Sequence, residues 1–143
     1  MRRVFFSFHY ERDVGRIGQI RNSWLTRGKA SSFLDAAKWE SIKRRGDDAI
    51  RGWINEQLRG TSVTVVLIGA KTANRRWVKY EIEQSIDRKN GLLGIYIHNV
   101  KDFRTGAIDN KGKSPFSKHF NFTPVHGQMV YLTSPHFIVQ LRD

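Results

Sequence analysis

The segment Ser62–Ile68 constrains the fold of this chain more than any other part of the sequence. Its apolar side chains do not alternate with polar ones: Val63 is followed by the continuous run Val65 to Ile68. This pattern is typical of a strand that is buried on both faces, as at the centre of a parallel sheet covered by helices. We therefore expect an α/β domain with such a sheet.

Further strands and helices are expected on both sides of this segment. Short apolar runs predict strands at residues 4–8, 31–34 and 92–97. Apolar residues three and four positions apart predict helices at 14–28, 47–60 and 74–89, and Asp47 or Asp48 is expected to cap the second of these. Residues 36–46 show only a weak helical pattern. The alternation of strands and helices predicts a doubly wound parallel sheet.

The character of the sequence changes after Asn99. Residues 101–124 are rich in Gly, Lys, Asn, Asp and Ser, which predicts a long loop. Residues 129–132 and 136–141 are expected to add a hairpin or edge strands. We therefore divide the chain into an α/β core at residues 1–100 and a loop-rich C-terminal extension at residues 101–143, packed on the same domain.

The composition excludes several classes of site. The chain has no cysteine, so disulfides, zinc–thiolate sites and thiol nucleophiles are ruled out. The five histidines lack metal-binding spacing, and neither the P-loop nor the glycine-rich dinucleotide motif occurs. The apolar run after Arg2-Arg3 is too short for a signal peptide or a membrane span, so we expect a cytoplasmic protein with no membrane partner.

The net charge of +12 favours an anionic partner such as nucleic acid or a phosphate-bearing small molecule. No basic helix carries interleaved aromatic residues, so nucleic acid is the weaker of these two possibilities. Ligands of parallel sheets bind where the strands end. This places the segments 9–13, 35–39 and 69–74 around one crevice.

The helix around Glu81 carries the most chemical information. Its spacing predicts a buried stripe of Val78, Ile82, Ser85 and Ile86, with Glu81 at the edge of that stripe, four residues after Trp77. Two interpretations follow from the pattern. Glu81 is either a functional carboxylate near the crevice or a border residue that forms an ion pair with Lys79 or an arginine.

Several blocks of sequence resemble TIR domains, and in particular the TIR-like proteins of the bacterial Thoeris anti-phage system. The opening strand 4–8 resembles the first TIR strand, and the segment Trp77 to Ile82 resembles the W-x-x-x-E helix of that family. Residues 35–40, 61–64 and 74–78 also resemble this group. The similarity covers residues 1 to about 100, and the segment 113–116 more faintly.

The resemblance implies a flavodoxin-like fold and an enzyme that uses NAD as its substrate, with no bound cofactor or metal. The nicotinamide–ribose bond would be cleaved, and a cyclic or conjugated ADP-ribose product would activate a separate effector protein. Glu81 corresponds to the catalytic glutamate of the family. The residues expected around the nucleotide are Ser7, Phe8, His9, Asp35, Trp39, Asn74 and Trp77.

Two further expectations concern regulation and partners. Self-assembly or a phage protein could be needed as a trigger for activity.

The rival functions are a non-catalytic interaction module, as many TIR domains are, and a basic nucleic-acid-binding domain. The second would show binding that weakens steeply with added salt.

Overall fold

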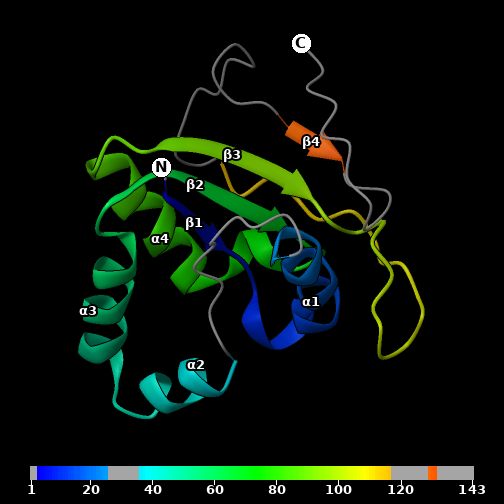
Figure 1. The fold of residues 1–143 in the computed structure, drawn as a ribbon, viewed down its shortest axis with the longest axis horizontal. Coiled ribbons are helices and arrows are strands. Elements are labelled where there is room, and N and C mark those ends of the chain that lie inside the picture. Colours follow the sequence, from blue (N-terminus) through cyan, green and yellow to red (C-terminus); the bar gives the residue numbers. More distant parts are fainter. Residues whose placement is uncertain (1–2, 26–35, 117–128, 132–143) are drawn as a thin grey trace.

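The protein is built on one parallel sheet, seen in a computed structural model that describes residues 3–25, 36–116 and 129–131. The four strands lie in the order β1 (Arg3–Ser7), β2 (Thr61–Ile68), β3 (Gly91–Tyr96) and β4 (Met129–Tyr131) (Figure 1). All three pairs of neighbours are parallel. The strand predicted from 62–68 therefore lies inside a parallel sheet, as its lack of alternation indicated.

Helices cover both faces of the sheet. They are α1 (Tyr10–Leu25), α2 (Ala36–Lys43), α3 (Asp47–Leu58) and α4 (Arg76–Asp87), with a short 3-10 helix, η1 (Thr72–Asn74), after β2. Thr64 and Val66 face α4, whereas Val65 packs in the cluster that contains Ile17 and Ile20 of α1. Figure 1 shows α2 and α3 on the side of β1, away from β4. The arrangement is the doubly wound α/β fold predicted from the sequence.

Most predicted element bounds agree with the structure to within a few residues, and two local predictions need correction. The helix expected at 74–89 begins only at Arg76, because residues 72–74 form η1. Neither aspartate caps α3: Gly46 occupies the N-cap with φ 93°, and no side chain accepts a hydrogen bond there. Asp47 and Asp48 lie in the first turn instead, where negative charge is favourable.

The weak pattern at 36–46 corresponds to a real helix, α2. Its two large apolar residues, Trp39 and Ile42, are 2% and 6% exposed, so they are enough to anchor so short a helix. The strand expected at 31–34, the end of the helix expected to reach residue 28, and residues 132–141 lie outside the described residues. For residues 129–132 the sequence predicted part of a hairpin or an edge strand. The structure shows β4 as a strand parallel to β3 at the end of the described sheet.

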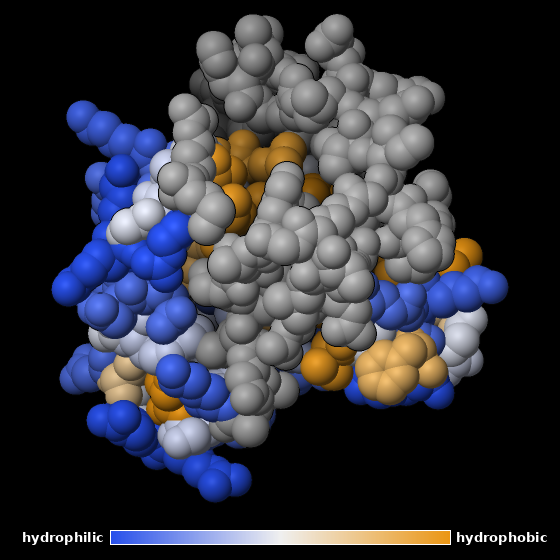
Figure 2. Space-filling model, viewed as in Figure 1, coloured by the Kyte–Doolittle hydropathy of each residue, from blue (hydrophilic) through white to orange (hydrophobic). Residues whose placement is uncertain are grey.

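Residues 101–116 contain no helix or strand, in agreement with the predicted loop. Figure 2 shows hydrophilic side chains over α3 and around the loop that follows β3. Among the described residues, the large apolar side chains exposed to solvent are Phe103 at 68% and Ile108 at 58%, both in that loop. None of the described helices is long and apolar enough to span a membrane.

Candidate functional site

Glu81 lies in the middle of the buried face of α4. That face consists of Val78, Glu81, Ile82 and Ser85, which recur at the three- and four-residue steps of a helix. The side chain of Glu81 is 0% exposed, whereas Ile86 is only half-buried. The sequence pattern placed Glu81 at the edge of the stripe and was wrong there. A helical pattern does not reveal the residue of another element whose hydrogen bond allows a carboxyl group to lie at the centre of the buried stripe.

That partner is Ser7, the last residue of β1. The Ser7 hydroxyl donates a hydrogen bond to Oε2 of Glu81, and both side chains are fully buried. Oε1 of Glu81 has no hydrogen-bond partner in the described part of the chain, nor does the carboxyl group form an ion pair there. The interpretation of Glu81 as a border residue paired with Lys79 or an arginine is therefore wrong.

The environment of Glu81 favours its protonated form. Burial raises the pKa of Glu81 to about 8, and the hydrogen bond from Ser7 opposes this shift. A carboxyl group that changes protonation near neutral pH is a recurring feature of enzyme active sites. Because the side chain is 0% exposed, the carboxyl group is closed off from bulk solvent in this arrangement.

Tyr10, the first residue of α1, lies at the centre of a cluster of aromatic rings. Its pKa is raised mainly by burial and also by the charge of Glu81. The Tyr10 ring stacks on Trp39 of α2 at 4.8 Å between centroids, and lies 4.1 Å from the ring of Phe8. Phe8 and Trp39, both predicted as substrate contacts, thus pack around Tyr10, and they are 3% and 2% exposed.

His9 follows in the same loop and is 9% exposed. Its Nδ1 accepts a hydrogen bond of 3.4 Å from the backbone N–H of Arg12, and burial together with the nearby Arg75 lowers its pKa. His9 is therefore neutral at physiological pH. A neutral imidazole next to the first loop can accept or donate a hydrogen bond to a ligand, but it adds no positive charge.

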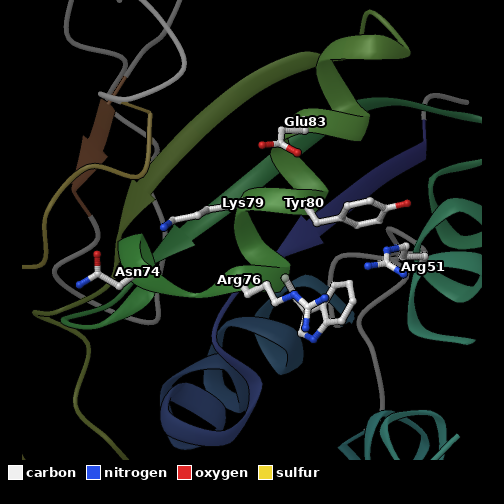
Figure 3. A pocket seen from close by; sticks show the side chains of 7 residues that line it. Arg51, Asn74, Arg76, Lys79, Tyr80 and Glu83 are labelled. Atoms are coloured by element: carbon white, nitrogen blue, oxygen red, sulfur yellow. The ribbon is translucent and has the colours of Figure 1, made fainter. Parts of the chain in front are cut away.

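Asn74 and Trp77 lie in a different place from the buried group. They line a surface cavity of about 360 Å³ together with Tyr80, Lys79, Glu83, Arg76 and Arg51. Figure 3 shows Lys79, Tyr80 and Glu83 on the outer surface of α4, with Asn74 in the turn before the helix and Arg51 approaching from α3. The structure therefore divides the predicted site into a buried part around Glu81 and an exposed part around Trp77.

The exposed cavity combines an indole ring with cations. The guanidinium carbons of Arg76 and Arg51 lie 4.6 and 5.8 Å from the centroid of the Trp77 ring, which is the geometry of cation–π contacts. Both arginines also pair with carboxylates at the start of α3, Arg76 with Asp47 at 2.7 Å and Arg51 with Asp48 at 3.0 Å. These contacts hold Trp77 against α3 from outside.

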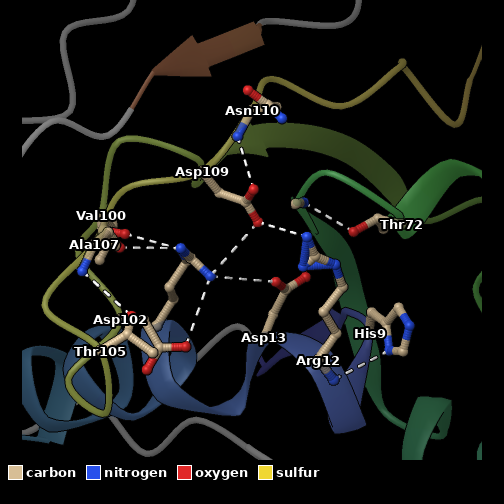
Figure 4. A network of polar contacts seen from close by, with 12 residues as sticks. His9, Arg12, Asp13, Thr72, Val100, Asp102, Thr105, Ala107, Asp109 and Asn110 are labelled. Carbon is tan, nitrogen blue, oxygen red and sulfur yellow. Dashed lines mark hydrogen bonds and ion pairs between the residues drawn. The ribbon is translucent and has the colours of Figure 1, made fainter.

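A second buried carboxyl group, Asp13, lies in an arginine-centred network between α1 and the loop after β3 (Figure 4). Arg16 donates hydrogen bonds to the carbonyl oxygens of Val100 at 2.9 Å and Ala107 at 3.1 Å. Its NH1 lies 3.8–3.9 Å from carboxylate oxygens of Asp13, Asp102 and Asp109. Arg16 therefore ties the irregular loop to α1.

Glycines permit this close packing. A Cβ atom at Gly15 would lie 2.1 Å from the Asp102 carboxylate, and one at Gly69 would lie 2.2 Å from the Asp13 carboxylate. Asp13 is 0% exposed and neither of its oxygens has a hydrogen-bond partner among the described residues. Burial raises the pKa of Asp13 to about 6, although Arg12 and Arg16 act against the shift.

Sequence analysis missed several of these residues. Tyr10 was only part of a polar segment, and Arg51 and Tyr80 were not connected with Trp77. Asp13 and Arg16 stand three apart in a helix, which is the spacing of a local ion pair. That signal could have been noticed, but it does not reveal burial or the loop partners. Asp35, a predicted substrate contact, lies outside the described residues.

The comparisons with known proteins point to one family. Residues 5–102 match the family described as Thoeris protein ThsB, TIR-like domain. A Bacillus cereus (strain MSX-D12) relative named "Putative cyclic ADP-D-ribose synthase ThsB1" is 47% identical over 118 residues, which cover 80% of this chain and 61% of the relative. The matched region thus spans about three fifths of the relative's length.

The matched family region contains the elements described above. It runs from Phe5 in β1 to Asp102 in the loop after β3, and it includes both Ser7 and Glu81. The parallel sheet, the helices on both of its faces and the position of Glu81 on α4 all lie within this region. The chain belongs to the family of Thoeris ThsB proteins with a TIR-like domain.

Proposed function

We propose that this protein cleaves the nicotinamide–ribose bond of NAD and converts the remaining ADP-ribosyl group into a cyclic or conjugated second messenger. The name of the Bacillus cereus relative, a cyclic ADP-D-ribose synthase, supports this substrate and product class. The observation that carries the proposal is the Glu81 carboxyl group. It is buried, hydrogen-bonded through one oxygen, and without a partner on the other among the described residues.

A single carboxylate is sufficient to assist cleavage of the nicotinamide–ribose bond. When the bond between the ribose carbon and the nicotinamide nitrogen breaks, its electron pair leaves with neutral nicotinamide and positive charge develops on the ribose. A carboxylate next to the ribose stabilises this oxocarbenium-like charge. A nucleophile then forms a bond to the same carbon and releases a proton. In a cyclic product this nucleophile is a group on the adenosine half of the same dinucleotide.

The bound substrate would itself prepare Glu81 for this role. The nicotinamide ring of NAD carries a positive charge, and an opposite charge nearby favours the ionised carboxylate over the protonated form. This offsets the effect of burial, which raises the pKa of Glu81 to about 8 in the closed arrangement. Ionisation is thus coupled to substrate binding.

Access to Glu81 requires movement, because the carboxyl group is fully buried. Tyr10 and Trp39, which stack on one another and belong to different helices, are the side chains we expect to separate. An external trigger such as a phage protein, or self-assembly, would supply the free energy for opening. Phe8, His9, Asp35, Trp39, Asn74 and Trp77 remain our predicted substrate contacts, whereas the hydroxyl group of Ser7 contacts Glu81. The messenger would act on a separate effector protein in the bacterial cytoplasm.

The direct test is NAD cleavage by purified protein, with and without lysate from phage-infected cells, followed by mass spectrometry of nicotinamide and ADP-ribose products. Wild type should release nicotinamide, and Glu81→Gln should lose at least about 100-fold in rate, as expected when a charge-stabilising group is removed. Glu56→Gln, an exposed substitution on α3, is the matched control and should behave as wild type.

The closed site favours a second candidate, a non-catalytic interaction module. It predicts no nicotinamide release under any of these conditions and equal behaviour of wild type and Glu81→Gln in defence against phage. If Glu81→Gln retains wild-type turnover, then Glu81 does not carry the chemistry.

A further inference from the structure

We propose that Ser7 is a positioning residue, which holds Oε2 of Glu81 so that Oε1 is the oxygen that meets the ribose of the substrate. This inference rests on the proposed function, in which Glu81 is the catalytic residue. It changes the role of Ser7, because the sequence predicted a substrate contact.

The two carboxylate oxygens of Glu81 are not equivalent. Oε2 receives the hydrogen bond from Ser7, while Oε1 is buried with no partner in the part of the chain that the structure describes. A buried polar atom without a partner is costly, and it is found where a ligand or a reaction step later supplies the partner. Oε1 is therefore the oxygen left for the substrate.

Hydrogen bonds around Glu81 hold its main chain in place, but they do not set the direction of its side chain. One turn along α4, the Ser85 hydroxyl donates to the backbone oxygen of Glu81 at 2.6 Å and lies 2.7 Å from the Thr64 hydroxyl of β2. These bonds join the turn of α4 after Glu81 to β2. On β1, Ser7 pairs with Val66 of β2, so its backbone is held in the sheet as well.

Ser7 is well suited to the remaining task. A glutamate side chain has three torsions, and ordering them costs conformational entropy that a directional hydrogen bond can offset. The Ser7 hydroxyl sits on a short side chain at the end of a strand and is 0% exposed, so its reach is limited to Glu81. Carboxylates positioned within a few tenths of an ångström of the productive geometry react far faster than mobile ones.

The neighbouring elements offer no competing charged anchor. The titratable group that interacts with Glu81 from α1 is the Tyr10 hydroxyl, and none of the described lysines, arginines or histidines shifts the pKa of the carboxyl group. The Ser7 bond opposes the effect of burial, so it stabilises the ionised form. Loss of the hydroxyl must therefore raise the pKa of Glu81 above its value of about 8.

The test compares Ser7→Ala, Ser7→Cys and Ser7→Thr with wild type in two measurements. The first is the pH dependence of kcat and KM for NAD cleavage. The second is the titration of the Glu81 carboxyl carbon by NMR in carbon-13-labelled protein, with Glu81→Gln used to assign the signal. Ser85→Ala is the matched control, because it removes a buried hydroxyl from the same helix without touching the carboxylate.

For Ser7→Ala we expect kcat to fall about 10- to 100-fold with KM changed less than about twofold. The rising limb of the pH–rate profile and the NMR midpoint should both move to higher pH. Ser7→Thr should restore most of the rate, and Ser7→Cys, a weaker donor of similar size, should lie between. Ser85→Ala should leave the NMR midpoint unchanged. If Ser7→Ala fails to fold, the Cys and Thr variants carry the comparison.

Three results would overturn the inference. They are an unchanged NMR midpoint in the Ser7 variants, an equal shift in Ser85→Ala, and a rise in KM with kcat unaltered, which would make Ser7 a substrate contact. Failure of the proposed function looks different. Wild type would then release no nicotinamide, while the NMR titration would still decide whether Ser7 holds Glu81.

Discussion

Among the residues that the structure describes, two carboxyl groups are completely buried, and they lie in opposite kinds of surroundings. The carboxyl group of Glu81 in α4 receives a hydrogen bond from one hydroxyl group, and no described cation pairs with it. Asp13 of α1 lies beside Arg16, whose NH1 is 3.9 Å from Oδ1, and near Arg12. Burial raises the pKa of both groups, to about 8 for Glu81 and to about 6 for Asp13.

The difference sets a carboxyl group held in a network of arginines against one that no described cation contacts. Arginines compensate part of the cost of burying Asp13, and the same network fastens residues 98–109 to α1. In the described part of the chain no cation compensates the burial of Glu81, so we expect this burial to lower the stability of the folded protein. Residues that are retained at such a cost are characteristic of functional sites. The predictions below test this contrast, beginning with the largest effect.

Removal of the central cation should affect stability most. Arg16→Met leaves Asp13 and Asp102 without their shared partner and removes the Arg16 hydrogen bonds to the carbonyl groups of Val100 and Ala107. The Ala107 carbonyl keeps the hydrogen bond from the backbone N–H of Asp102. We expect the free energy of unfolding in urea to fall by about 3–5 kcal/mol. Arg59→Met, which removes an exposed ion pair with Glu56, should change it by less than about 1 kcal/mol. A loss below about 1 kcal/mol for Arg16→Met would contradict the structural role of the network.

Replacement of Glu81 should stabilise the protein at neutral and higher pH. The folded-state pKa of about 8 exceeds the ordinary value of 4.5, so between these values only the folded protein holds the proton. The wild-type free energy of unfolding therefore falls as pH rises through this window, by up to about 1.4 kcal/mol per pH unit.

Glu81→Gln has no carboxyl group to ionise, so its stability should not fall in this way. The melting temperature of Glu81→Gln minus that of wild type should therefore increase from pH 5 to pH 8. Thermal melts at four pH values provide the measurement. A constant difference between the two proteins across this range would show that Glu81 is ionised at little cost.

The packing of the arginine network can be tested with two glycines of α1. A Cβ atom at position 15 would lie 2.1 Å from the Asp102 carboxylate, whereas position 18 has open space around it. We expect Gly15→Ala to destabilise the protein by about 1–3 kcal/mol through overpacking. Gly18→Ala should stabilise it by about 0.5–1 kcal/mol, because alanine favours the helix. The same sign for both substitutions in urea unfolding would contradict the close contact.

The effect of Asp13→Asn should be confined to a narrower range of pH than that of Glu81→Gln. The pKa of about 6 lies above the ordinary value of 3.8, so Asp13 also makes the folded protein less stable as pH rises, but only between these two values. Between these pH values the free energy of unfolding should fall less steeply in the variant than in wild type. The difference in slope should be up to about 1.4 kcal/mol per pH unit. Above pH 6 the two stability curves should run parallel, since the remaining slope belongs to Glu81. If the stability curves of Asp13→Asn and wild type diverge only above pH 6, then the pKa of Asp13 in the folded protein is not about 6.

Much of the fold could be predicted from local patterns. The run Val65 to Ile68 indicated a strand covered on both faces, and the helical spacing of Val78 and Ile82 indicated α4, because burial imposes these periods on the sequence. Residues at positions 31–34 lie outside the described part, so that strand stays a prediction. Glu81 was identified from the W-x-x-x-E resemblance, which also led to the correct family.

The arrangement of the site could not be predicted in the same way. Ser7 and Glu81 are 74 positions apart, and their hydrogen bond exists because β1 and α4 meet across the sheet. Trp77 and Glu81 are only four apart, yet Trp77 lines the outer cavity against α3 while Glu81 points into the core.

The sequence alone therefore determined the elements, their parallel order and the candidate carboxylate, since these follow from short-range patterns and from family motifs. The tertiary structure decided which carboxyl groups are buried, what each one contacts, and hence the pKa of each. Solvation and charge at a buried site depend on residues from distant segments, and no local pattern in the chain records them.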